Sequence, residues 1–348
     1  MSAPARTLGG TSKTAGVGFS VVLKCPACTK TVENSTGEKS NGSSLYICEG
    51  CDLHFWHPVA MPDRAWYEAA YAGRDHTAMP LEPGHRFFLS DPAAPKRGRL
   101  LDIGCGVGNF LAAARDAGFE VTGVEFDASA VAFARKHYGL QDVFSVRPEE
   151  FRERSRQTFD VVTSFEVLEH QDDPQRFLET ANDFLAPGGF LAVSVPNRER
   201  WQKGLEPLDY PPNHLTRWSP KALRNLLERN GFEVMTLEKE PLGIHRAAQV
   251  LSAGLRTGMA FRVAGERTPT ISDLAEMNPG DVRNTLRRVS EQPRHRVAAQ
   301  LAVLKAWAMI PLATLLLPYL RLRGHSGLYL YCLAQKQAIT PGRSEGRV

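Results

Sequence analysis

The sequence predicts an α/β fold with a small cysteine-rich module near its N-terminus. Two observations predict this organisation. From Arg99 to Asp127 an apolar strand, a glycine-rich turn, an amphipathic helix and a second strand follow one another, which is the order of a βαβ unit. Upstream, four cysteines form two C-x-x-C pairs between Cys25 and Cys51. We therefore expect one large α/β domain with a smaller addition before it.

The composition is that of an ordinary globular protein. The 348 residues carry a formal net charge of +4, with 43% hydrophobic and 23% charged residues, so the overall charge indicates no class of partner. Residues 241–325 differ, because they hold 12 Lys and Arg against 5 Asp and Glu, a local excess of +7. The basic character is confined to that segment.

Residues 1–20 are expected to form a disordered leader. They lack a positively charged start followed by an apolar core, so they do not resemble a secretory signal peptide, and a cytoplasmic location is the default expectation. The longest apolar run, Ala306 to Leu320, has 15 residues and contains Pro311 and Pro318, whereas a spanning helix needs about 20 residues. A transmembrane helix is not expected.

Basic side chains flank this apolar run, which leaves two interpretations open. Lys305 precedes it and Arg321 and Arg323 follow it, as in segments that lie on a bilayer surface. Residues 306–323 could therefore make peripheral membrane contact. The alternative is a buried helical hairpin.

The four paired cysteines fit a tetrahedral zinc site, formed by Cys25, Cys28, Cys48 and Cys51. Each C-x-x-C turn can aim two sulfurs at one point, and two such turns complete the coordination that Zn²⁺ prefers. A pair of unrelated redox motifs is the alternative. The polar segment between the pairs needs a stabilising cross-link in order to fold, so zinc would supply most of its stability. Residues 21–57 resemble a zinc ribbon, in which the metal is structural.

The glycine-rich turn is built to bring backbone close to a ligand. It reads D-x-G-x-G-x-G, with Asp102 at the end of the strand and Glu125 at the end of the next strand. A dinucleotide site has G-x-G-x-x-G instead, and an acid at the strand end suits a cationic amine better than a pyrophosphate. The pattern therefore argues against a dinucleotide.

From about Leu100 to Val234, and again near Gly327 to Lys336, the sequence resembles class I S-adenosylmethionine-dependent methyltransferases. The matching stretches are LDIGCGVGNFL, VTGVEFD, FDVVTSFEVLEH and LAPGGFLAVSVPN. The resemblance implies a Rossmann-like seven-stranded methyltransferase sheet, with residues 100–240 as its core and residues 326–338 as its last strand. The alternating GLYLYCLAQK stretch predicts that this last strand lies at an edge of the sheet.

The resemblance also implies a set of residues that bind S-adenosylmethionine. Glu125 would bind both ribose hydroxyls and Phe126 would flank the adenine. The family often has an acid facing the adenine amine where Arg147 and Pro148 stand here, so Glu149 or a backbone group would serve instead. The full candidate set is Asp102, Gly104, Cys105, Gly106, Gly108, Glu125, Phe126 and Phe165.

The stretch FEVLEH suggests a second site beside the cofactor. If a short helix begins there, Glu166, Glu169 and His170 share one helical face. The loop after the fifth strand, which contains His214, returns over the same cleft. An E-x-x-E-H stretch with a later histidine resembles two groups of metal-dependent O-methyltransferases. One acts on polyprenyl catechols in ubiquinone biosynthesis, and the other methylates the terminal ribose 2′-hydroxyl of small RNAs.

That second resemblance implies a metal-assisted reaction. Glu166, Glu169, His170 and His214 would bind Mg²⁺ or a similar ion, which lowers the pKa of an acceptor hydroxyl. His214 or His170 would have an alternative catalytic role as general base. The competing interpretation is a solvated helix start, since acids favour the first turn of a helix.

The remaining segments complete the predicted organisation. Residues 58–99 would form a helical cap or linker, with Trp66, Tyr67 and Tyr71 as candidate cleft aromatics. Residues 241–325 would form a basic, apolar helical insertion that bears on substrate choice, and residues 339–348 a tail. The sequence does not indicate an oligomeric state.

The preferred interpretation is an S-adenosylmethionine-dependent O-methyltransferase acting on a small hydroxylated acceptor, lipophilic or catechol-like. An RNA-modifying ribose 2′-O-methyltransferase is the first alternative. The zinc ribbon and the basic segment favour it, but no basic stripe interleaved with aromatics supports a nucleic-acid partner. A non-catalytic scaffold is the second alternative, and the intact glycine-rich turn argues against it.

Overall fold

The computed structural model describes residues 23–40, 42–58, 76–201, 205, 209–254 and 304–337. The predicted leader, the three candidate cleft aromatics Trp66, Tyr67 and Tyr71, most of the insertion and the tail lie outside the described residues.

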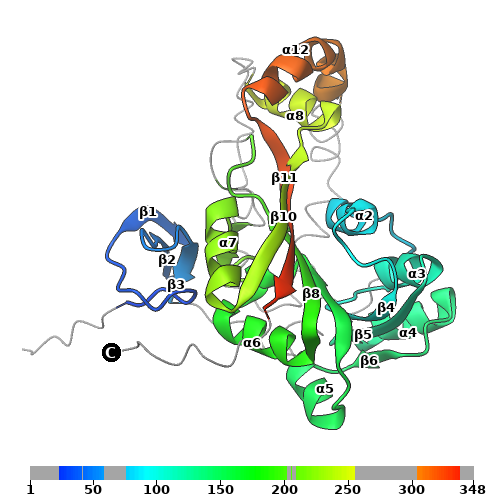
Figure 1. The fold of residues 1–348 in the computed structure, drawn as a ribbon. Coiled ribbons are helices and arrows are strands. Elements are labelled where there is room, and N and C mark those ends of the chain that lie inside the picture. The colour runs from blue at the N-terminus through cyan, green and yellow to red at the C-terminus, as the bar shows by residue number, and fades with distance from the viewer. Residues whose placement is uncertain are drawn as a thin grey trace, which may run out of the picture.

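A seven-stranded sheet forms the centre of the molecule (Figure 1). In sheet order its strands are β10 (Phe232–Pro241), β11 (Ser326–Lys336), β8 (Leu185–Pro196), β7 (Phe159–Phe165), β4 (Gly98–Ile103), β5 (Phe119–Glu125) and β6 (Val143–Ser145). The five strands from β8 to β6 are parallel, and β11 runs antiparallel to both of its neighbours. The predicted α/β class with a seven-stranded sheet is confirmed.

The prediction that the last strand lies at an edge is wrong. Tyr331 of β11 lies opposite Ser194 of β8 on one side and Glu238 of β10 on the other, so β10 is the edge strand. Residues 330–334 are all buried, as expected where both faces of a strand are covered. Alternation of residue types along a strand indicates which of its faces are buried. It does not indicate which strands lie beside it in the sheet.

Helices cover both faces of this sheet, as in a doubly wound fold. Apolar side chains of α2 (Pro83–Ser90), α3 (Asn109–Asp116) and α4 (Ala128–Tyr138) form one core cluster. Those of α5 (Pro148–Arg154), α6 (Pro174–Phe184) and α7 (Pro220–Arg229) form another. Polar side chains start two of these helices: Asp127 accepts from Ser129 N at α4, and Ser219 accepts from Ala222 N at α7.

Two helices stand at the far end of the long β10 and β11 strands (Figure 1). They are α8 (Ile244–Gly254) and α12 (Ile310–Leu322), which pack on each other around a small apolar cluster. Several large apolar side chains nearby are exposed, namely Leu304, Trp307, Leu312, Leu315, Tyr319 and Leu322. No described helix is long and apolar enough to cross a membrane, and contact of residues 306–323 with a membrane surface stays a prediction.

A second, four-stranded sheet contains the N-terminal module. Its order is β1 (Ser35–Ser40), β2 (Ser43–Ile47), β3 (His54–His57) and β9 (Thr216–Arg217). Three strands belong to the cysteine-rich segment, and the fourth comes from the chain between β8 and α7. Figure 1 shows the module beside α7, where Asn225 Nδ2 donates to Cys51 O at 3.3 Å.

Candidate functional site

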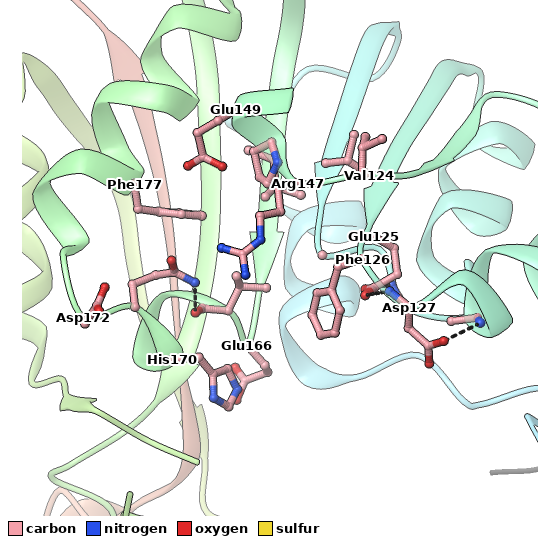
Figure 2. Close-up of a pocket in the computed structure, with 18 of the residues that line it drawn as sticks. Val124, Glu125, Phe126, Asp127, Arg147, Glu149, Glu166, His170, Asp172 and Phe177 are labelled. Atoms are coloured by element: carbon pink, nitrogen blue, oxygen red, sulfur yellow. Dashed lines mark hydrogen bonds between the residues drawn. The ribbon is translucent and has the colours of Figure 1, made fainter. Parts of the chain in front are cut away.

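A cavity of about 680 Å³ opens at the carboxyl ends of β4, β5 and β7 (Figure 2). Its lining includes Gly104 after β4, Glu125 at the end of β5 and Glu166 after β7. Ligands of open α/β sheets bind at this edge, because the loops that follow the strands gather there. The cavity is the candidate cofactor site.

The turn after β4 is held by the acid that ends β5. Glu125 Oε2 accepts from Gly106 N at 3.0 Å, and its Oε1 accepts from Asp127 N at 3.0 Å. Gly104 and Gly106 have φ values of 79° and 52°, in the left-handed region that glycine adopts without strain. Burial raises the pKa of Glu125. The carboxylate therefore sits between the turn and the cavity, where Figure 2 shows it beside Phe126.

Half of the predicted cofactor set lines the cavity, namely Gly104, Gly106, Glu125 and Phe126. Asp102 does not, because it is buried in strand β4 and accepts from Thr163 Oγ1 of the neighbouring strand β7 at 2.6 Å. Burial raises the pKa of Asp102 to about 7. At this position the acid joins β4 to β7 inside the sheet and is not part of the cavity wall.

The other three members of the set also face away from the cavity lining. Gly108 packs against α4, and a Cβ there would lie 2.9 Å from the Cβ of Ala134. Cys105 faces Gly123, whose added Cβ would lie 2.7 Å from the Cys105 sulfur. Phe165 packs edge-on against Phe110, with ring centroids 4.8 Å apart. All three residues therefore pack within the domain and not against the cavity.

Other lining residues were missed or left open by the sequence. Arg147, Pro148 and Glu149 follow β6 and line the cavity, so the place where the family often has an acid does face the cofactor site. Six carboxylate residues line the cavity against two arginines; the acids are Glu125, Asp127, Glu149, Glu166, Asp172 and Asp173. Such a lining favours a cationic ligand. Among the lining residues outside the predicted cofactor and ion sets, only those after β6 carried a signal in the sequence.

The FEVLEH stretch does not form the helical face that the sequence predicts. Glu166 has a φ of 56°, and only Leu168–His170 form a short 3₁₀ helix, η1. The Glu166 carboxylate accepts from Ser194 Oγ at 2.8 Å. It therefore does not join the group of Glu169, His170 and His214. The reason is that the left-handed residue turns the chain before the helix begins.

Glu169, His170 and His214 form a compact group of potential metal ligands. One ligand atom from each lies within 4.8 Å of the others. Both imidazole Nε2 atoms approach the same carboxylate oxygen, Glu169 Oε1, at 3.8 Å for His170 and 3.9 Å for His214. Three of the four predicted ligands are thus brought together, and Glu166 is the exception.

The hydrogen bonds of this group leave two of its atoms, His170 Nε2 and Glu169 Oε2, available to bind a cation. His170 Nδ1 donates to Asn213 O at 2.5 Å, so in the neutral ring Nε2 carries a lone pair that faces the Glu169 carboxylate. The buried Glu169 Oε2 has no hydrogen-bond partner among the described residues. Burial raises the pKa of Glu169 to about 7 and lowers the pKa of His170. Electron-rich atoms that converge without enough donors fit a divalent ion.

The four N-terminal cysteines converge as well. Their sulfurs all lie within 4.8 Å of one another, and all four side chains are buried. The two C-x-x-C turns are alike, because each is followed by a left-handed residue, Thr29 with φ 60° and Asp52 with φ 68°. Burial raises the pKa of Cys28 to about 11, so a cation is needed to hold this thiol ionised at neutral pH. The module is zinc-ribbon-like in its cysteine arrangement.

Comparisons with known proteins agree with the methyltransferase resemblance of the sequence. A family model described as a methyltransferase domain matches residues 74–237. A ubiquinone biosynthesis O-methyltransferase from Coxiella burnetii is 28% identical over 190 residues, which cover 49% of this chain and 81% of the relative. Another from Caulobacter sp. is 36% identical over 154 residues, covering 42% of this chain and 60% of the relative. A probable S-adenosylmethionine-dependent methyltransferase from Mycolicibacterium smegmatis is 32% identical over 160 residues, covering 46% and 60%.

Solved structures of the same kind resemble the chain more loosely. A S-adenosylmethionine-dependent methyltransferase from Archaeoglobus fulgidus has a TM-score of 0.42 at 17% identity, covering 73% of this chain and 92% of that one. One from Mesorhizobium loti has a TM-score of 0.39 at 17% identity, covering 73% and 96%. Such low scores carry no functional weight. Residues 74–237 therefore form a methyltransferase domain, which contains the cavity beside the glycine turn, and over this part the chain is similar to S-adenosylmethionine-dependent methyltransferases.

Proposed function

We propose that the protein transfers the methyl group of S-adenosylmethionine to a hydroxyl of a small acceptor, with a divalent ion held by Glu169, His170 and His214. One observation carries the proposal. The group of ligand atoms adjoins the cofactor cavity, because His170 belongs to both. Two relatives named as ubiquinone biosynthesis O-methyltransferases support transfer to oxygen.

The donor set favours one type of ion over the Mg²⁺ expected from the sequence. Two imidazoles and one carboxylate suit a first-row transition metal such as Mn²⁺ or Fe²⁺, whereas Mg²⁺ prefers oxygen ligands and retains several waters. The His170 Nδ1 donation to Asn213 O is the kind of bond that orients a metal-ligating histidine. We therefore use Mn²⁺ as the probe.

The chain's own residues would have distinct tasks. S-adenosylmethionine supplies an electrophilic methyl group on a sulfonium, and the ion supplies a Lewis acid that lowers the pKa of the acceptor hydroxyl. Glu125 would hold the ribose hydroxyls, and the acidic lining would favour the positive sulfur. The acceptor oxygen loses its proton to solvent and attacks the methyl carbon, while the carbon–sulfur bond breaks and its electron pair stays on sulfur. Without an ion, His214 Nε2 would take the proton instead.

We further propose that Cys25, Cys28, Cys48 and Cys51 bind one structural Zn²⁺. Four sulfurs within 4.8 Å of one another match a closed tetrahedral site, in which no position remains for a substrate. The zinc content of the purified protein tests this proposal, and one zinc per chain is expected.

Methyl transfer from labelled S-adenosylmethionine tests the reaction. The acceptors are catechol, 4-nonylcatechol and phenethylamine, each with and without added Mn²⁺. We expect Mn²⁺-stimulated O-methylation of the catechols, and loss of transfer in Glu169→Gln but not in the exposed control Glu179→Gln. Transfer to the amine alone, or undiminished transfer in Glu169→Gln, would contradict the proposal. A protein that does not bind S-adenosylhomocysteine would be a scaffold.

A further inference from the structure

The cysteine module and the candidate ion site share one segment of chain, residues 209–217. Strand β3 of the module pairs antiparallel with β9, with His54 opposite Arg217 and Phe55 opposite Thr216. Trp56 N donates to Leu215 O at 3.0 Å. The end of the segment is therefore a strand of the module's own sheet.

Trp56 also holds the beginning of the segment. Its indole Nε1 donates to Asp209 O at 3.0 Å, and its ring lies 5.5 Å from the ring of Tyr210. The side chain is only 1% exposed, so its donor has no access to water and depends on this carbonyl. His214 lies between the two points that the module holds.

The opposite side of the same segment contacts the ion site. Leu215 N donates to Glu169 O at 2.8 Å, and Thr216 Oγ1 donates to the same oxygen at 3.3 Å. Asn213 O accepts from His170 Nδ1. Residues 209–217 are thus bonded to β3 on one side and to η1 on the other, and the place of His214 depends on both.

The segment has little regular structure of its own. Its only strand, β9, has two residues, too few to be stable without a partner. The partner strand begins two residues after Asp52, which directly follows the ligand Cys51 and is itself anchored. Arg198 Nη2 donates to Asp52 Oδ2 at 2.5 Å, and Ser219 Oγ donates to the same oxygen.

The module is joined to the main domain by apolar packing as well. Cys25, Leu53 and Phe55 belong to the same buried cluster as Leu223 and Leu226 of α7. A change in the fold of the module therefore reaches the domain through both the core and the β3–β9 pairing.

From this arrangement we infer that the cysteine module is a positioning element of the acceptor site, which sets the place of His214 relative to Glu169 and His170. The module acts through backbone and packing, and none of its described residues lines the cavity. Its metal stabilises β3, and β3 holds the His214 segment. The inference rests on the proposed ion site, and it assigns to the zinc a role beyond the stability of the module.

The test uses the full chain and a substitution that keeps the module folded. Trp56→Phe removes the indole donor but retains an aromatic ring, and Tyr46→Phe on β2 is the matched control. For both variants and wild type we would measure zinc content, the unfolding temperature, and the affinities for S-adenosylhomocysteine and Mn²⁺. Trp56→Phe should retain one zinc and bind S-adenosylhomocysteine as tightly as wild type, while its Mn²⁺ affinity falls about tenfold, as for other losses of orienting contacts around a metal.

The outcomes separate the inference from the proposed function. Unchanged Mn²⁺ affinity in Trp56→Phe, with both ligands bound by wild type, would overturn the positioning role and leave the proposed function intact. Equal losses of both affinities together with a lower unfolding temperature would also overturn it, since they indicate general destabilisation. A wild type that takes up no Mn²⁺ would overturn both. A Cys51→Ser variant that loses zinc and Mn²⁺ affinity but binds S-adenosylhomocysteine would support it.

Discussion

The two halves of the cleft are built in different ways. The cofactor half comes from a contiguous stretch, in which β4, the glycine turn, α3 and β5 follow one another and Glu125 closes back on Gly106. The proposed acceptor half is assembled from separate segments: η1, the chain around His214, and β3 of the cysteine module. The first half is therefore self-contained, whereas the second depends on contacts between distant parts of the chain.

This difference implies that the two halves can be damaged independently. Substitutions in the turn after β4 should affect cofactor binding and leave binding of the ion and the acceptor unchanged. Substitutions around Glu169 or His214 should affect the ion and the acceptor while cofactor binding survives. The following predictions test that separation, from the largest expected effect to the smallest.

Replacing His214 should affect only the acceptor half. His214→Gln removes one of the three proposed ligands, so Mn²⁺ affinity should fall by more than about a hundredfold, beyond the loss seen for outer contacts of a metal site. Affinity for S-adenosylhomocysteine should stay within about twofold of wild type. Electron paramagnetic resonance of Mn²⁺ measures the first and calorimetry the second, with the exposed His137→Gln as control. Retained Mn²⁺ binding would remove His214 from the site.

Replacing Glu125 should have the reverse effect. Glu125→Ala removes the carboxylate that holds Gly106 N and that would hold the ribose hydroxyls. Charge-assisted hydrogen bonds of this kind contribute about 3 kcal/mol, so affinity for S-adenosylhomocysteine should fall about a hundredfold. Mn²⁺ binding should not change. Glu120→Ala, at an exposed position of the same strand, is the control, and a similar loss in both variants would argue against a role for Glu125.

Within the glycine turn, the free energy of unfolding should distinguish a glycine that packs inside the domain from one that lines the cofactor cavity. Gly108 has φ 82°, and an added Cβ would lie 2.8 Å from Leu140 and 2.9 Å from Ala134, so Gly108→Ala should lower the free energy of unfolding by about 3 kcal/mol. Gly106 has φ 52° and no atom within 4 Å of an added Cβ, so Gly106→Ala should cost about 1 kcal/mol. Urea unfolding measures both. Equal losses would mean that Gly108 is not packed against α4.

The last effect, smaller than that of Gly108→Ala, concerns a buried histidine of α2 that packs against α3 of the cofactor half. His85 lies between Phe110 and Phe165, with ring centroids 5.0 Å away in each case, and burial lowers its pKa to about 4. The unfolded chain then binds more protons between pH 4 and 6.5, so the contribution of His85 to stability is lost as pH falls through this window. The loss should be about 2 kcal/mol between pH 7 and pH 5.

Because Asp102 and Glu169 have raised pKa values and act in the opposite direction, the measurement is the difference between wild type and His85→Gln. The unfolding free energy of the variant should fall less steeply as the solution is acidified. Parallel curves for the two proteins would mean that His85 is protonated in the folded state.

The structure of the cofactor half, which is contiguous in the sequence, could be predicted from the sequence. The structure of the acceptor half, which comes from separate segments, could be predicted only in part. Strand, turn and helix follow from local hydrophobic periodicity and glycine spacing, so β4, α3 and β5 were expected where they lie. The pairing of β3 with β9 joins residues about 160 positions apart through backbone hydrogen bonds, which carry no signature in the side chains. The same limit explains why the internal place of β11 was missed.

Glu166 shows a second limit of prediction from the sequence. A glutamate rarely adopts a left-handed conformation, so the sequence predicted a helix that would carry Glu166, Glu169 and His170 on one face. The φ of 56° at Glu166 instead directs its carboxylate to Ser194. His214 lies beside Glu169 because its loop follows β8, the strand beside β7. Topology at the carboxyl edge of the sheet was the useful guide.

The most direct test of the two-half cleft is a crystal structure with S-adenosylhomocysteine and Mn²⁺, with diffraction measured at the manganese absorption edge. We expect the ribose hydroxyls on Glu125 and one anomalous peak between Glu169, His170 and His214, on the side of the cavity that His170 lines. Bound S-adenosylhomocysteine without manganese at these three residues would contradict the account of the acceptor half. Absence of the cofactor product from the cavity would contradict the account as a whole.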